Sequence, residues 1–127
     1  DKVTVFELPR DYLWLGSVIN DAISSSSTRA KEFLKGVFAE IGHSIKKIHQ
    51  SSSLVPMDLT YSDIVVERDV IGFKILPPVE FVRVDDVSAP VSVGEIMLED
   101  LIQNAGSPKQ KEAITDAFNG YWEEVSA

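Results

Sequence analysis

The chain has 127 residues, which is enough for one domain, residues 1–127, with a hydrophobic core of its own. It contains no cysteine, so disulfides, thiolate metal sites and cysteine nucleophiles are excluded. A net charge of −8 argues against nonspecific binding to nucleic acid, and no apolar run reaches the roughly 20 residues that a membrane span requires.

The first 50 residues predict one strand followed by two helices. Residues 3–8 alternate apolar and polar side chains up to Pro9, a pattern that is typical of a short strand. Apolar residues at helical spacing then predict a helix over residues 11–24. The run of hydroxyl side chains at 24–28 offers an N-cap, and the strongest helical periodicity of the chain predicts a helix over residues 28–50.

The middle of the chain changes to a period of two, which is typical of strands. Residues 63–69 and 70–76 predict a pair of strands around a turn near Arg68–Asp69, and residues 78–87 predict a third strand. We expect these three to form an antiparallel meander, extended by the N-terminal strand in a four-stranded version. Pro77 and Pro78 belong at an edge or a corner, because proline cannot donate to a ladder.

Two helices are predicted to close the chain. Ser92 and Glu95 have the S-x-x-E spacing of a capping box, and Ser107 followed by Pro108 starts a second helix. The predicted order is therefore β-α-α-β-β-β-α-α. This order indicates an α+β fold in which a small antiparallel sheet of three to four strands packs with about four helices.

The stretch "FAEIGHSIKKIHQ" at residues 38–50 holds both histidines and resembles half of a metal site. A helical wheel at about 100° per residue places Glu40 and His49 at opposite rims of the apolar stripe and turns His43 away from it. Ligands on one helix must face the same cavity, and no second E-x-x-H is present. We therefore predict no metal, no cofactor and no catalytic residue in this motif.

Small residues on the same helix suggest a contact surface instead. Gly36, Ala39 and His43 form an outward strip, and each glycine in an exposed helix costs about 1 kcal/mol relative to alanine. Close approach of another element would offset that cost, so this strip is a predicted interaction surface; cover by another part of the same chain is the competing interpretation. Trp14, beside the stripe of the first helix, is a second candidate for an exposed contact.

The first functional hypothesis is accordingly a non-enzymatic interaction, assembly or regulatory module whose partner is another protein or a second copy of this chain. One alternative is a small enzyme or ligand-binding protein with a pocket between sheet and helices, using residues such as His49, Asp85 and Asp86. Another is an acidic inhibitor that mimics nucleic acid through Glu112, Asp116 and Glu123 on the last helix.

Charge and cysteine content bear on partners and location. Residues 29–50 carry five basic and two acidic side chains in an otherwise acidic chain, so this helix either pairs with its own acidic neighbours or docks an acidic partner. The lack of cysteine favours a reducing compartment such as the cytoplasm, although secreted bacterial domains also lack it. No basic segment followed by an apolar one indicates a signal peptide.

Overall fold

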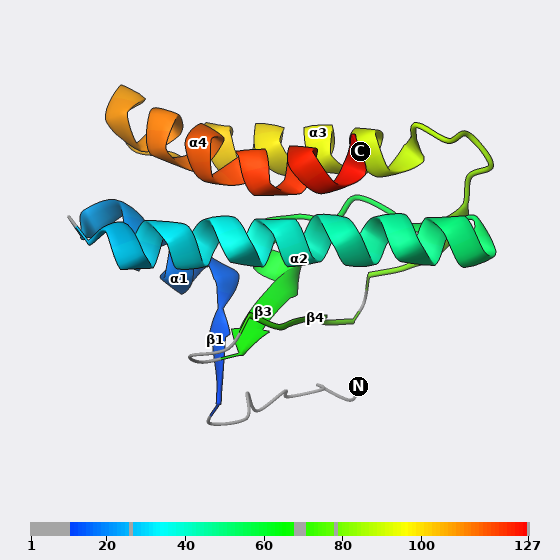
Figure 1. Cartoon of the computed structure of the whole chain (residues 1–127), viewed down its shortest axis with the longest axis horizontal. Helices are drawn as coiled ribbons and strands as arrows, with labels where there is room; N and C mark the ends of the chain where they lie inside the picture. Colours follow the sequence, from blue (N-terminus) through cyan, green and yellow to red (C-terminus); the bar gives the residue numbers. More distant parts are fainter. Residues whose placement is uncertain (1–10, 26, 68–70, 78, 127) are drawn as a thin grey trace, which may run out of the picture.

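The long helix α2 (Thr28–Ser52) is the centre of the fold and lies between a pair of helices and a small sheet (Figure 1). The structure, a computed structural model, describes residues 11–25, 27–67, 71–77 and 79–126. The hydroxyl of Ser27 accepts a hydrogen bond from the N–H of Ala30 at 3.4 Å and so caps the start of α2. At the other end, Ser53 takes a left-handed conformation with φ of 58°. The helix predicted over 28–50 and its serine cap are therefore confirmed.

Three further helices surround α2: α1 (Leu15–Ser24), α3 (Ala89–Gln103) and α4 (Pro108–Val125). Figure 1 shows α4 running alongside α2 in the same direction, with α3 antiparallel beside α4. The hydroxyl of Ser107 accepts a hydrogen bond from the N–H of Gln110 at 3.2 Å, and Pro108 is the first helical residue, as predicted.

The capping box predicted at Ser92 and Glu95 is wrong, because α3 begins one turn earlier, at Ala89. Pro90 occupies the first turn, where its missing N–H costs nothing. The carboxylate of Asp86 accepts hydrogen bonds from the N–H of Ser88 at 2.9 Å and from its hydroxyl at 2.8 Å. This local turn directs the chain into the helix without the predicted pair.

The strands form two separate antiparallel sheets. One sheet has the order β1 (Tyr12–Trp14), β3 (Ile64–Glu67), β4 (Phe73–Ile75), and the other pairs β2 (Leu54–Pro56) with β5 (Phe81–Arg83). The fold class and element order are those predicted, but the single meander is wrong. The third strand of the predicted meander, β5, leaves β4 and pairs with β2, where Val55 lies opposite Val82.

Two details of the sheets explain the difference. The N–H of Met57 donates to the carbonyl of Glu80, and the N–H of Val84 donates to that of Ser53, so the pairing of β5 continues beyond both ends of β2. The segment that follows the predicted helix over 28–50, for which no strand was predicted, is thus a strand at Leu54–Pro56. Likewise β1 occupies positions predicted as the start of the helix over 11–24, while the strand predicted over 3–8 and the turn near 68–69 lie outside the described residues.

The core is formed where α2 meets the other elements. Helices account for 64% and strands for 14% of the described residues, and the fold is α+β. Phe38 on α2 packs against Phe118 on α4 with ring centroids 4.9 Å apart, and Phe118 stacks on Tyr121 at 5.0 Å. The hydroxyl of Tyr121 donates a hydrogen bond to the carbonyl of Pro90 on α3. None of the described helices is long and apolar enough to cross a membrane.

Glycines allow α2 and α4 to approach closely at one crossing point. A Cβ atom added at Gly42 would lie 2.9 Å from the carbonyl oxygen of Tyr121, and one added at Gly120 would overlap the carbonyl oxygen of Lys35. Both obstacles are backbone atoms, which cannot rotate away as a side chain would. The two helices are therefore packed backbone to backbone at this crossing.

Candidate docking groove between α1, α2 and α4

The predicted interaction strip on α2 is divided among different neighbours. Gly36 is half-buried below Ile71, because a Cβ atom added there would lie 2.8 Å from the Cδ1 atom of that side chain. Ala39 is half-buried beside α4, where its backbone N lies 3.2 Å from the position of a Cβ atom on Gly120. His43 is exposed. Other parts of the same chain thus cover Gly36 and Ala39. For these two residues the structure agrees with the alternative that the small residues serve packing within the chain.

Trp14, the other predicted contact residue, lies on β1 and not on α2. It is the last residue of β1, pairs with Val65 in register, and is 44% exposed. Its partial exposure is compatible with a contact role, but the structure does not bring it next to Gly36, Ala39 or His43 as one surface.

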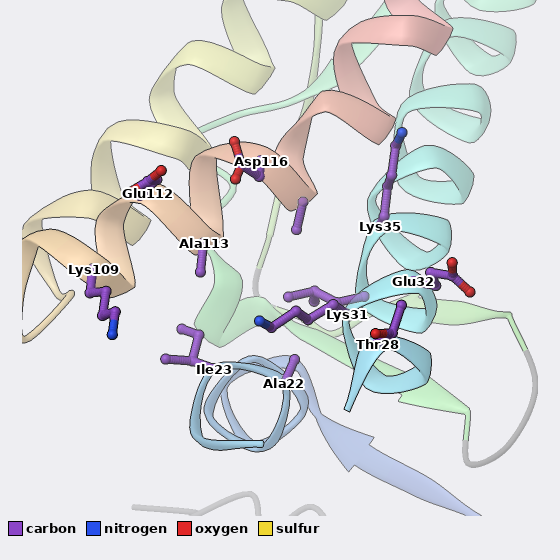
Figure 2. Close-up of a pocket in the computed structure, with 12 residues that line it drawn as sticks. Ala22, Ile23, Thr28, Lys31, Glu32, Lys35, Lys109, Glu112, Ala113 and Asp116 are labelled. Carbon is purple, nitrogen blue, oxygen red and sulfur yellow. The ribbon is translucent and has the colours of Figure 1, made fainter. Parts of the chain in front are cut away.

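A groove of about 430 Å³ lies where the first turns of α2 and α4 meet the C-terminal end of α1 (Figure 2). Its apolar lining comes from residues of all three helices: Ala22, Ile23, Leu34, Ala113 and Ala117. Three of these five are alanines, whose short side chains leave space between helices that a leucine would fill. On both helices the lining residues of the groove come before Gly42 and Gly120, and Ala22 on α1 completes the lining there.

The charged side chains around the groove differ in direction. Figure 2 shows Lys31 on α2 and Lys109 on α4 extending from opposite walls toward Ile23, whereas Glu112 and Asp116 point away from the space. Within the described part of the chain, the ammonium groups of Lys31 and Lys109 make no hydrogen bond and no ion pair. The lining carries three basic and three acidic residues, and Glu32 on α2 also points away from the space in Figure 2. The charged groups directed toward Ile23 are therefore the ammonium groups of Lys31 and Lys109.

Farther along α2, two basic side chains contact groups on α4. The Lys35 ammonium lies 3.2 Å from a carboxylate oxygen of Glu123, and Lys46 donates a hydrogen bond to the carbonyl of Glu124 at 3.3 Å. Both contacts join α2 to α4. The charge excess predicted for residues 29–50 is therefore partly balanced by the acidic last helix, and Lys31 is the one of its remaining basic residues that lines the groove.

The residues of the alternative pocket, His49, Asp85 and Asp86, lie around the junction between β5 and α3. The Nε2–H of His49 donates to the carbonyl of Val84 at 2.6 Å, and Asp85 lies 3.2 Å from the Nε atom of Arg83. Hydrogen bonds from the backbone and hydroxyl of Ser88 lower the pKa of Asp86, and the nearby His49 lowers it further. Each of the three makes a local contact that a structural role explains.

The carboxylates proposed as a nucleic-acid mimic are not one free array. Glu112 and Asp116 lie on the rim of the groove, and Glu123 is paired with Lys35. Among the described residues, no group of three or more histidine or acidic side chains is arranged to hold a metal ion.

Sequence patterns did not identify the groove, and its residues explain why. Ala22 and Ala117 occur on the apolar stripes of their predicted helices, and Lys31 and Lys109 are 78 positions apart in the chain. The signal in the sequence that could have indicated the groove was the presence of small side chains, Ala22 in one predicted helix and Ala113 and Ala117 in another. No family model, no curated protein and no solved structure matches this chain.

Proposed function

We propose that this chain is a non-enzymatic protein-interaction module, and that the groove between α1, α2 and α4 takes up a helical segment of a partner protein. The observation that carries the proposal is the groove itself, an apolar floor formed by three helices with charged side chains at its rim. An amphipathic helix that lays its apolar face into such a groove is a recurring mode of peptide recognition.

The form of the groove favours a protein segment over a small molecule. Small-molecule sites bury most of their ligand, whereas this groove is open to solvent and is bordered by exposed charged residues from two walls. A helix placed there would bury its apolar stripe on Ile23 and Ala113, the half-buried apolar residues of the lining, and keep its polar face in water. Self-association is a different use of the same surface and gives a different experimental result.

Site-specific photo-crosslinking tests the proposal. A photo-reactive phenylalanine analogue at Ala113 should cross-link to a protein in extracts of the source cells, and the cross-linked peptide should be predominantly helical when bound to the purified chain. The same analogue at Asn119, which is exposed on α4 outside the groove, is the matched control.

The peptide identified in this way should then be synthesised and titrated. Ala113→Trp fills the groove and should weaken its binding at least tenfold, whereas Asn119→Trp should leave binding unchanged. Equal binding by both variants would overturn the proposal. So would sedimentation showing that the cross-linked partner is a second copy of this chain.

A further inference from the structure

We infer that the partner helix carries acidic side chains on one face, which contact Lys31 and Lys109 beside an apolar anchor that covers Ile23. This inference rests on the proposed function and specifies the partner class of the same groove. It follows from which charged side chains around the groove are already paired and in which direction each of them points.

The first step concerns the cations. Of the three lysines that line the groove, Lys35 is already paired with Glu123, but Lys31 and Lys109 make no ion pair in the described part of the chain. They belong to opposite walls, and Figure 2 shows both extending toward the end of α1. A single occupant in the groove would therefore meet both ammonium groups.

The second step concerns the neighbouring apolar surface. Ile23 is half-buried and lies below the two lysines, with Ala22 and Ala113 beside it. Lysine carries its charge on an apolar stem, so the stems of Lys31 and Lys109 extend the apolar surface and present their charges at its edge. The complementary ligand has an apolar group next to carboxylates.

The third step concerns the acids. Glu32, Glu112 and Asp116 also line the groove, but in Figure 2 they point away from Ile23, so Lys31 and Lys109 are the charged groups directed toward a carboxylate that enters beside it. On an amphipathic helix, residues three or four positions apart lie on the same face, about one turn of 5.4 Å from each other. Acids on one face of such a helix, next to an apolar residue, would meet Lys31, Lys109 and Ile23 together.

A displayed library of helical peptides, randomised at surface positions, tests this charge preference with the full chain as bait. The unmodified chain should enrich helices that have acids within one turn of a large apolar residue. Lys31→Glu combined with Lys109→Glu should enrich basic residues at those positions and weaken the acidic peptides roughly tenfold. Affinity for the acidic peptides should also fall as the sodium chloride concentration rises from about 50 to 500 mM.

The matched control is Lys47→Glu combined with Lys111→Glu, which changes net charge equally at exposed positions outside the groove. If the control shifts charge selection as strongly as the groove variant, or the groove variant shifts nothing, the charge inference is overturned. The proposed function still stands in that case if Ala113→Trp abolishes enrichment. If no helix is enriched, or Ala113→Trp has no effect, the proposed function fails as well.

A small amphiphile is the remaining outcome to separate. Dodecanoate, a carboxylate on a flexible apolar chain, should bind the purified chain at least tenfold more weakly than the enriched peptides. Tighter binding of dodecanoate that Lys31→Glu and Lys109→Glu abolish would overturn the inference and assign the groove to small ligands.

Discussion

Small residues have opposite effects at two places where α4 meets its neighbours. At the crossing with α2, Gly42 and Gly120 let the two backbones come into contact and leave no space. In the groove, Ala113 and Ala117 face α1 and α2 across an open space of about 430 Å³. Small side chains thus allow backbone contact at one place and leave a groove at the other. Their presence in the sequence alone does not distinguish a packed contact from a groove.

The crossing provides the largest expected effect. Gly120→Ala should lower the free energy of unfolding by about 3 kcal/mol, because the added methyl group meets the backbone carbonyl of Lys35. The gain in helix propensity, about 1 kcal/mol, is too small to compensate. Urea denaturation measures the difference, with Asn119→Ala, an exposed neighbour on α4, as a control expected to change stability by less than about 0.5 kcal/mol. Similar stabilities for the two variants would mean that the helices are not in backbone contact.

A smaller loss is expected from the hydroxyl that ties the crossing to α3. Tyr121→Phe leaves the carbonyl of Pro90 without its donor and should cost about 1.5 kcal/mol. Burial raises the pKa of the Tyr121 phenol, so the folded protein retains this proton more firmly than the unfolded chain. Stability of the wild type should therefore fall as the pH rises above the ordinary value of 10.0, and the variant should lack this part of the decline. Tyr61→Phe is the control, and an equal loss there would contradict the role of the Tyr121 hydroxyl.

The next smaller effect on stability is expected from Asp100, a partly buried carboxylate on α3. Burial raises the pKa of Asp100, and the nearby Asp63 raises it further, against an opposing effect of the Tyr61 backbone N–H. The folded state then binds more protons, so stability should fall as the pH rises from 3.8 through the raised pKa. Asp100→Asn should remove this decline and leave the protein more stable than the wild type at pH 7, measured by thermal unfolding between pH 4 and 7. An unchanged pH profile, matching that of the exposed control Glu99→Gln, would refute it.

The groove should show the smallest effect on stability. Ala113→Leu places its larger side chain in open space, so the free energy of unfolding should change by less than about 0.5 kcal/mol. This result would sharpen the contrast with Gly120→Ala on the same helix. A loss above about 1 kcal/mol, measured by urea denaturation, would show that position 113 is packed like the crossing and that the two regions do not differ.

Local patterns in the sequence determined most of the elements of this protein. The periodicity of residues 28–50 fixed α2, and Ser107 with Pro108 fixed the start of α4, because caps and amphipathic spacing act within a few residues. Alternation likewise identified the strand at residues 81–83. The α+β class and the element order followed from these local signals.

Only the tertiary structure decided which elements meet. The pairing of β5 with β2 instead of β4 depends on hydrogen bonds between segments about 30 residues apart, for which alternation carries no partner information. The groove also depends on tertiary structure. Lys31 and Lys109 line one space only because α2 and α4 lie side by side and α1 ends next to both. The sizes of the side chains limit how closely two helices are able to approach. The actual distance between the helices at each position depends on the angle and the point at which they cross.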